Sequence, residues 1–233
     1  MTTRPELPMN PVAPVVILLV VVIALVEGWV SLAEAGLTGG GQGAVGLRLQ
    51  MVQDWGFSPV IWDQVMGLGD RSFAMVRRFV TYAFVHGSFT HALFGAALLL
   101  ALGKFVGDVF RWWAVLAVFL AGLLAGAVAF GVLIDGPRWL FGCYPGVYAL
   151  IGAFSYILWL RLGQRGENRL RAFRLIGLLL IVQLAFAALG PVIGGGFDPG
   201  FVADLAGFVA GFLVSTVVSP GGLAALRRRI QAR

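Results

Sequence analysis

Charged residues are scarce in this chain, and so are cysteine, lysine and histidine. Only 12% of its 233 residues are charged while 59% are hydrophobic, and a soluble domain carries about twice that charged fraction. Cys143 is the single cysteine, which excludes an intramolecular disulfide and a cysteine-ligated metal cluster. The two histidines, His86 and His91, have no carboxylate or thiolate partner near them in the sequence, so we expect neither a metal site nor a cofactor. The composition indicates a membrane protein.

The basic residues do not indicate a nucleic-acid partner, although the formal net charge is +6. They are scattered at the ends of apolar segments and form no patch, so they report on membrane topology. All of them except Lys104 are arginine. Together with the abundant glycine and alanine, this composition is typical of a GC-rich bacterial genome.

A bilayer core requires about 20 apolar residues per helix, and six segments of this chain approach that length. They are Pro11–Ala33, Thr90–Phe105, Trp112–Leu133, Pro145–Leu160, Leu175–Ile193 and Phe201–Ser219. The second and fourth have only about 16 residues each, so we expect them to thin the bilayer or to begin inside the protein. We therefore predict one polytopic membrane domain over residues 11–222, between a short N-terminus (1–10) and a basic C-terminal tail (223–233).

The arginines also predict the orientation. If the N-terminus is cytoplasmic, twelve of the 17 basic residues fall inside and five outside. This asymmetry favours cytoplasmic termini, and we expect a bacterial inner membrane. Ala33-Glu34-Ala35 resembles a signal-peptide cleavage site, but the apolar run before it exceeds the usual length of about 7–15 residues. We therefore favour an anchored first helix.

About 40 residues of mixed character separate the first two apolar segments, from Gly36 to Val76. This stretch opens with Gly39-Gly40-Gly41 and continues with amphipathic sequence around Trp55, so we predict short helices that lie on the outer membrane surface. Arg77 and Arg78 would then lie outside, against the general asymmetry. We expect them to anchor the loop by donating to its backbone carbonyls.

Four landmarks follow in the second part of the chain. They are Arg78 with His86-Gly-Ser-Phe-Thr-His91, Gly103, the stretch from Gly142-Cys143-Tyr144-Pro145-Gly146 through Tyr148 to Gly152, and Asp204-x2-Gly207-x3-Gly211. Glycines four residues apart share one helix face and let a neighbouring backbone approach closely. We expect Gly142, Gly146, Gly152, Gly207 and Gly211 to pack helices together, and Gly122 and Gly126 have the same spacing. Pro145 favours a helix that begins at Tyr144 or Pro145, and we expect Gly142 to allow an unusual backbone just before it.

In this order and spacing, the landmarks resemble those of the rhomboid family of intramembrane serine proteases, over roughly Arg77 to Ser219. The resemblance implies an all-α bundle of six transmembrane helices with a long amphipathic first external loop and a hydrophilic depression that opens to the outside. In an active rhomboid, a serine at the start of the fourth helix is paired with a histidine of the last helix, which takes the hydroxyl proton. Backbone N–H groups, the second histidine of the His-x4-His motif and an asparagine four residues later hold the oxyanion.

This chain departs from that pattern at almost every catalytic position. The resemblance assigns Tyr144 to the nucleophile, Asp204 to the base, Gly95 to the oxyanion asparagine, His86 and His91 to the histidine motif, and Tyr148 to the tyrosine beneath the catalytic imidazole. Pro145 also removes a backbone donor. Proton transfer from a phenol, with a pKa near 10, to a carboxylate, with a pKa near 3.9, is uphill by about 8 kcal/mol. A tyrosine–aspartate dyad therefore does not replace the missing one.

The retained polar groups then need structural roles. An ionisable residue inside a transmembrane helix marks a paired or functional position. We expect Asp204 to accept a hydrogen bond from Tyr144 or Tyr148, and Glu27 to face a bonded partner in the bundle or else a water-filled cavity. We expect Ser88 and the two histidines to cap the second helix, the histidines also bonding loop carbonyls, and Ser155 to bond its own backbone.

Two functions remain open. The first is a rhomboid-like pseudoprotease that binds transmembrane segments of other membrane proteins within the lipid bilayer without cleaving them. The alternative is an active intramembrane endopeptidase with a displaced nucleophile, for which Cys143 at the start of a helix is the best candidate. A buried structural thiol is the simpler interpretation of Cys143, because neither histidine is expected opposite it. A transporter or channel is disfavoured, since no inverted repeat is visible.

Overall fold

The computed structural model describes residues 11–37, 46–189 and 199–222, and these residues form helices. The long helices are α1 (Pro14–Glu34), α6 (Phe89–Gly107), α7 (Trp112–Leu133), α8 (Tyr144–Gln164), α9 (Arg174–Leu189) and α10 (Gly200–Val218). Short helical pieces are α2 (Leu47–Trp55), α3 (Pro59–Trp62), η2 (Asp63–Gly67), α4 (Phe73–Val76), α5 (Arg78–Thr81), η3 (Tyr82–Phe84) and η4 (Arg169–Phe173). The predicted all-α fold is confirmed for this part of the chain.

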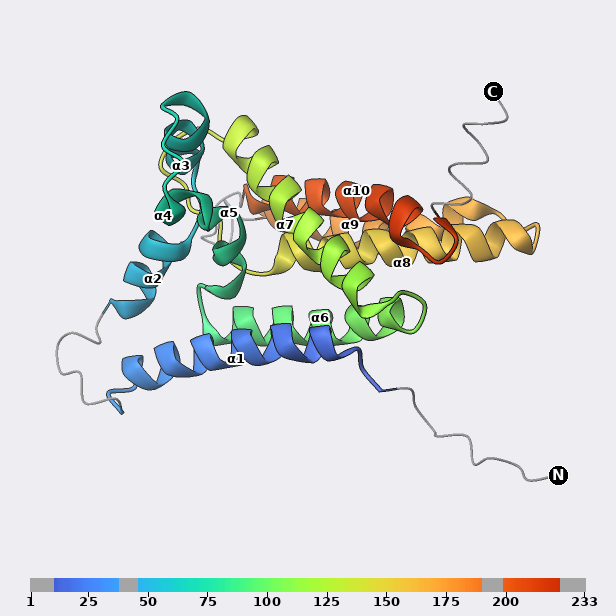
Figure 1. The fold of residues 1–233 in the computed structure, drawn as a ribbon, viewed down its shortest axis with the longest axis horizontal. Coiled ribbons are helices and arrows are strands. Elements are labelled where there is room, and N and C mark those ends of the chain that lie inside the picture. The colour runs from blue at the N-terminus through green and yellow to red at the C-terminus, as the bar shows by residue number, and fades with distance from the viewer. Residues whose placement is uncertain (1–10, 38–45, 190–198, 223–233) are drawn as a thin grey trace.

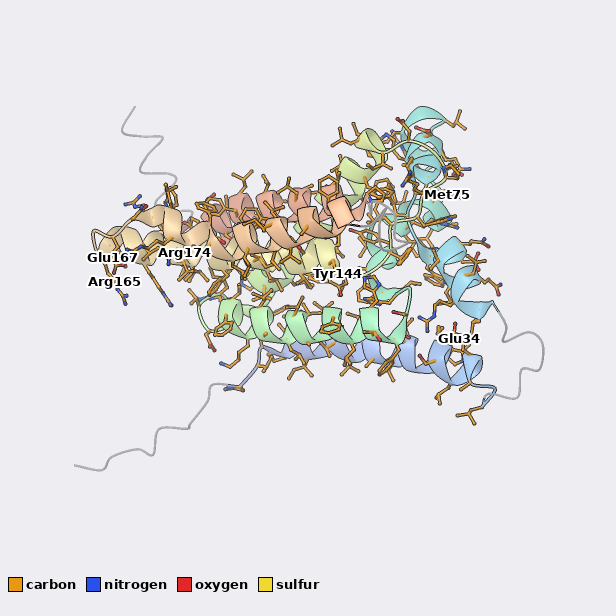
Figure 2. The ribbon with its side chains drawn as sticks, turned by 180° about the vertical axis from the view of Figure 1, so that it is seen from behind. Glu34, Met75, Tyr144, Arg165, Glu167 and Arg174 are labelled. Carbon is orange, nitrogen blue, oxygen red and sulfur yellow. The ribbon has the colours of Figure 1, made fainter. Side chains whose placement is uncertain are left out.

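The long helices form two groups. Figure 1 shows α1 and α6 side by side in one group and α8, α9 and α10 in the other, with α7 running obliquely across both. The short helices α2 to α5 gather at the end of the bundle where α6, α8 and α10 begin (Figure 1). The charged Arg165, Glu167 and Arg174 lie at the opposite end (Figure 2).

Within the described ranges, five helices are long and apolar enough to cross a membrane by length and composition, namely α1, α6, α7, α8 and α10. Helix α9 has 16 described residues, and the predicted end of this segment, residues 190–193, lies outside the described ranges. The predicted shortness of the second and fourth spans is wrong, since α6 has 19 residues and α8 has 21. Both helices continue past the apolar run at one or both ends, and α8 includes Arg161 in its last turn. The two terminal segments (1–10, 223–233) and Gly39-Gly40-Gly41 also lie outside the described part.

Helix α8 is enclosed by α7 and α10, and glycines make this possible. A Cβ on Gly207 would collide with the carbonyl oxygen of Pro145, and one on Gly211 with that of Ala149. From the other side, a Cβ on Gly122 would meet Ala149, and one on Gly126 would lie 2.7 Å from the Pro145 side chain. The predicted close packing of both glycine pairs is confirmed. Because every residue from Pro145 to Ala153 is buried, the start of α8 is surrounded by protein and exposes little surface to lipid.

Helix α1 packs on α6 at Gly103, the second of the four sequence landmarks. A Cβ on Gly103 would lie 2.6 Å from Val16 of α1. Within α1, Glu27 is only 5% exposed and its carboxylate binds Arg48 of α2, with the closest atoms 2.8 Å apart, and also accepts from Ser31. The expectation of a bonded partner for Glu27 is therefore confirmed.

The long first loop is anchored as predicted. Arg78 donates to the carbonyl oxygens of Gln53 and Gly56, and Arg77 donates to that of Asp54 at 3.1 Å. The Arg77 guanidinium also lies over the Trp55 ring, 3.7 Å from its centroid. Between the described residues, one isolated antiparallel bridge joins Phe57 of this loop to Leu140, just before α8. The loop is thus fixed to the segment that leads into the candidate site.

Candidate functional site

The site begins at a sharp backbone turn before α8. Gly142 has φ 97°, a conformation that favours glycine, and its N–H donates to the carbonyl oxygen of Tyr82. Helix α8 then begins at Tyr144 with Pro145 in its first turn, as predicted. The expectation that Gly142 allows an unusual backbone before the helix is confirmed. Its expected role in packing helices is wrong, because it precedes the helix and a Cβ there would lie 3.0 Å from the imidazole of His91.

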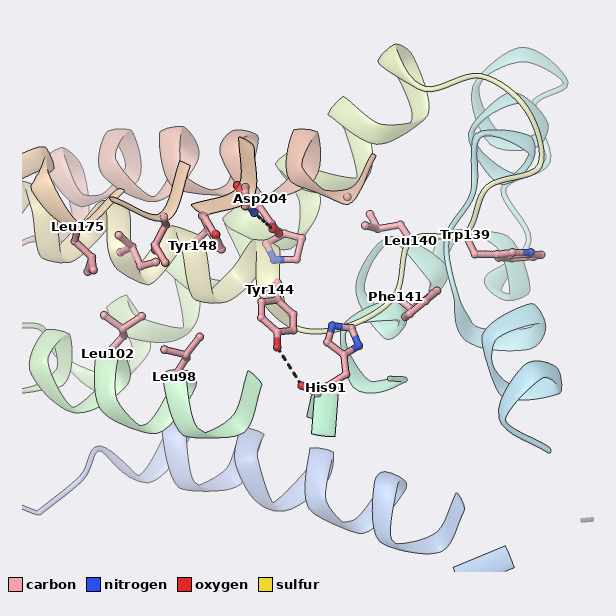
Figure 3. Close-up of a pocket in the computed structure, with 15 residues that line it drawn as sticks. His91, Leu98, Leu102, Trp139, Leu140, Phe141, Tyr144, Tyr148, Leu175 and Asp204 are labelled. Atoms are coloured by element: carbon pink, nitrogen blue, oxygen red, sulfur yellow. Dashed lines mark hydrogen bonds between the residues drawn. The ribbon is translucent and has the colours of Figure 1, made fainter. Parts of the chain in front are cut away.

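Tyr144 turns back toward the start of α6. Its hydroxyl donates to the backbone carbonyl oxygen of His91 at 3.1 Å, and its ring stacks on the His91 imidazole with centroids 4.8 Å apart and planes 14° from parallel. Figure 3 shows this side chain pointing from α8 to His91. Of the two expected donors to Asp204, Tyr144 is therefore wrong, since its single phenol proton is directed to His91, while Tyr148 stays a prediction.

The two histidines accept from backbone N–H groups. His86 Nε2 accepts from the N–H of Cys143, and His91 Nδ1 accepts from that of Gly87, each at 3.4 Å. Ser88 alone provides the side-chain cap of α6, with its Oγ accepting from the His91 N–H. The prediction for Ser88 is confirmed, while the two imidazoles accept from N–H groups that lie outside α6. Both rings are turned toward the start of α8.

Cys143 lies beside His86, which the sequence did not indicate. A Cβ built on Gly95 would lie 2.7 Å from the Cys143 sulfur and 3.5 Å from His86 Nε2, so all three groups meet at one point. The expectation that no histidine would lie near Cys143 is wrong, because the loop before α6 brings His86 under the start of α8. Cys143 is fully buried, as predicted.

Burial disfavours the charged forms of both groups. It raises the pKa of the Cys143 thiol to about 12. Burial and the neighbouring His91 lower the pKa of His86 to about 4. A thiolate paired with an imidazolium is therefore opposed at both ends, and Cys143 has the properties of a structural thiol.

The place of the oxyanion asparagine is filled by the same thiol. Gly95 lies in α6 one turn after His91, and the Cys143 sulfur occupies the volume that a longer side chain at this position would need. The structure thus gives a physical reason for a glycine at position 95.

Asp204, at the base position, is 9% exposed and accepts a hydrogen bond at 3.3 Å from the side-chain amide of Gln183 in α9. Sequence reasoning missed Gln183. Its signal was present, because Gln183 is the one amide in the apolar run 175–189. Figure 3 shows Asp204 above Tyr144 and Tyr148, on the side of the site opposite His91.

A cavity of about 370 Å³ lies between the start of α6 and Asp204. Its lining comes from α6, α8, α9, α10 and the segment 139–141, and its polar members are His91, Tyr144, Tyr148, Gln183 and Asp204. Across the cavity, Leu98 and Leu102 of α6 face Tyr148 and Leu175 (Figure 3). Tyr144 and its stacking partner His91 both line the cavity, and Figure 2 shows Tyr144 between α6 and the helices above it.

The other predicted residues lie around this centre. Tyr148 lines the cavity beneath Asp204, and Gly146 and Gly152 pack α8 against Phe119 of α7 and the Phe208 carbonyl of α10. The prediction that Ser155 bonds its own backbone is wrong, since its Oγ is buried without a hydrogen-bond partner. Among the described residues, the arrangement positions hydrogen-bond acceptors and an apolar wall, and it aligns no hydroxyl for transfer of a proton to an imidazole.

Comparisons with known proteins support the resemblance that the sequence landmarks indicate. The Rhomboid domain model matches residues 74–221, a range that contains Tyr144, Asp204 and both histidines. Rhomboid-related protein 2 of Mus musculus is 28% identical to the chain over 148 residues. That alignment covers 60% of this chain and 47% of the mouse protein, so the chain spans about half the length of the curated relative that it matches.

Proposed function

Because the chain belongs to the rhomboid family, we propose that it is an integral membrane protein that binds transmembrane segments of other membrane proteins without cleaving them. The activity that the family resemblance implies needs a nucleophile and a base that can exchange a proton. At the matching positions stand Tyr144 and Asp204, and each is directed elsewhere by a hydrogen bond. We further propose a bacterial inner membrane with both termini in the cytoplasm.

The stacking of Tyr144 on His91 carries this proposal. The ring fills the space next to the imidazole where a substrate carbonyl would have to lie, and its hydroxyl is held by the His91 carbonyl oxygen. Hydrolysis needs a nucleophile aligned with its base, and this pair offers a closed contact between two rings. The cavity beside the pair keeps an apolar wall suited to a helix side chain.

The cleavage test uses the full chain in liposomes with a single-span substrate that carries helix-destabilising residues. We expect no product over the background of empty liposomes. Product that disappears when Tyr144 is replaced by Phe would overturn the proposal.

The binding test measures energy transfer from the protein's tryptophans to a dansyl-labelled transmembrane peptide of about 20 leucine and alanine residues. We expect saturable transfer that falls when Leu98, in the cavity wall, is replaced by Phe. Leu205→Phe is the matched control, because Leu205 lies outside the cavity on α10 and is 38% exposed against 39% for Leu98. If the two substitutions reduced energy transfer equally, the peptide would not bind in the cavity.

A second candidate function, peptide-bond cleavage by Cys143, draws support from the position of its sulfur and of His86 Nε2, which both lie against Gly95. The burial and raised pKa of the thiol oppose it. Cys143→Ala distinguishes the two functions, since it would abolish any cleavage by the thiol and leave peptide binding intact.

A further inference from the structure

The end of the bundle opposite the candidate site carries a surplus of positive charge. Seven basic and two acidic residues lie within positions 104–113 and 161–174, and Figure 2 labels three of them at this end. Both acids are already in ion pairs. These pairs are Asp108 with Lys104 and Glu167 with Arg171. Among the residues that the structure describes, the other five basic side chains have no carboxylate partner. They are Arg111, Arg161, Arg165, Arg169 and Arg174.

A cavity of about 530 Å³ lies at this end. It is enclosed by the C-terminal parts of α8 and α10, by η4 and by the turn 219–222. Its volume falls in the range of about 300–1,000 Å³ that ligand pockets have in proteins. Among its described lining residues Arg169 alone is charged, and the hydroxyl-bearing Tyr156, Thr216 and Ser219 also line it. The cavity therefore offers hydrogen-bond donors and a positive charge without a carboxylate, which suits an anion.

Arg169 is held over this cavity by α8. A Cβ on Gly163 would collide with its guanidinium, so the glycine is what lets the side chain cross the helix there. The guanidinium carbon lies over the Trp159 ring, 5.6 Å from the centroid. A guanidinium has five N–H donors, and contact with a ring face leaves them able to bind an anion. Within the described ranges no hydrogen bond engages these donors.

Aromatic rings form the apolar wall of the cavity. Phe173 of η4 packs on Trp159 with centroids 5.6 Å apart, and Phe212 of α10 packs on Phe173 at the same distance. A neighbouring cavity shares the turn 219–222 and is lined by Arg111 and Trp113. Tryptophan and arginine gather where a transmembrane protein meets the lipid headgroups. Both cavities are therefore expected at headgroup depth.

We propose that the cavity beside Arg169 binds the headgroup of an anionic phospholipid. The planar fork of the guanidinium matches two oxygens of the lipid phosphate. The ring wall contacts the glycerol backbone and the first carbons of the acyl chains. The surrounding arginines disfavour a headgroup that carries its own positive charge, so an anionic lipid binds better than a zwitterionic one. The inference needs only that the chain lies in a membrane, and it is independent of the proposed binding of transmembrane segments.

The test uses the full chain in phosphatidylcholine liposomes. Each preparation contains a rising fraction of phosphatidylglycerol that carries a pyrene group on one acyl chain, or phosphatidylcholine with the same label as the neutral reference. Energy transfer from the protein's tryptophans to pyrene reports the labelled lipids that lie against the protein. We expect the anionic lipid to bind about fivefold more tightly than the neutral one. Equal binding of the two lipids would overturn the inference.

Two substitutions that remove the same charge locate the binding. Arg169→Gln should reduce the preference for the anionic lipid to about twofold or less. Arg165→Gln is the matched control, because Arg165 is exposed at the same end but does not line the cavity, and it should keep most of the preference. Equal losses in the two variants would mean that the whole basic end attracts the lipid, which would overturn a site at Arg169.

A second pair of variants keeps the charge. Arg169→Lys retains the cation without the planar fork and should bind the anionic lipid more weakly than the parent protein. Arg165→Lys should bind it as the parent does. This pair serves if Arg169→Gln unfolds, which thermal unfolding checks. Equal binding by both lysine variants and the parent would contradict recognition of the phosphate by the guanidinium.

Inorganic phosphate distinguishes a lipid from a soluble anion. Added at equal ionic strength, phosphate and chloride screen the surface to the same extent. Transfer to the labelled phosphatidylglycerol should therefore be the same in both salts. Loss of transfer in phosphate alone would show that the cavity takes a free anion, and the assignment to a lipid would be wrong.

Discussion

Tyr144 shows how one residue decides the chemistry of the site. Serine at this position would have no ring to stack on the His91 imidazole, whereas tyrosine stacks on it and bonds the backbone of the same residue. The sequence was sufficient to predict that no proton transfer links Tyr144 and Asp204. It could not predict the partner of the phenol, because the stack depends on the turn at Gly142 and on the start of α6, which are distant in sequence.

At the same scale, the lowered pKa of His86 predicts that the folded protein loses stability in acid. Its pKa falls from 6.5 to about 4 in the folded protein, so the unfolded chain binds the proton more readily. The stability from neutral His86 is complete above pH 6.5 and is lost as the pH falls toward 4, by about 3 kcal/mol in total. Thermal unfolding in detergent at pH 7 and pH 4.5 should show the loss.

The matched variant is His86→Gln, which retains an acceptor for the Cys143 N–H and does not titrate. Its melting temperature should depend less on pH than that of the parent protein. The nearby ionisable groups Glu27, Arg48 and His91 remain in both proteins. An identical pH dependence in the two proteins would assign the acid sensitivity to one of these groups.

At the scale of elements, α8 is the part that the others position. Its first three turns are buried between α7 and α10, and its glycine contacts are with backbone atoms that cannot move aside. The glycine spacing in the sequence predicted this face correctly, because a four-residue repeat defines one side of a helix. The lengths of α6 and α8 were predicted too short, since hydropathy marks the apolar run and a helix can extend beyond it with polar residues.

This packing predicts a sharp difference between glycines. Gly207→Ala and Gly211→Ala each place a methyl group against a backbone carbonyl of α8 and should destabilise the protein by about 1–3 kcal/mol or more. Gly177→Ala in α9 has no heavy atom within 4 Å of the new Cβ and should be neutral or stabilising by up to about 1 kcal/mol. Thermal unfolding in one detergent compares all three variants. A Gly177 variant as unstable as the others would mean that the effect is not due to close packing.

At the scale of the whole molecule, Arg48 joins three separate parts. Its guanidinium binds Glu27 and Glu34 of α1 and donates at 2.9 Å to the carbonyl oxygen of His86. The first helix, the external loop and the histidine segment are thus connected through one side chain. Sequence reasoning predicted a partner for Glu27 but could not name it, because the two positions are 21 apart in the sequence and lie in different helices.

Breaking this connection should have a large effect. Glu27→Gln leaves Arg48 without its most buried partner and should reduce the free energy of unfolding by about 3 kcal/mol. The matched control is Asp108→Asn, which breaks the more exposed ion pair with Lys104 and should change stability by about 0.5 kcal/mol or less. Chemical or thermal unfolding of the two variants measures the contrast. A loss of similar size in both would show that Arg48 does not link the parts energetically.

The meeting of Gly95, Cys143 and His86 has a consequence for attempts to redesign the site. Replacing Tyr144 with serine alone would leave Pro145 without an N–H and Asp204 at the position that the rhomboid resemblance assigns to the base. An asparagine at position 95 would collide with the sulfur of Cys143, so that residue would have to change first. Position 95 and Cys143 are therefore coupled, so that a larger side chain at one position requires a smaller one at the other.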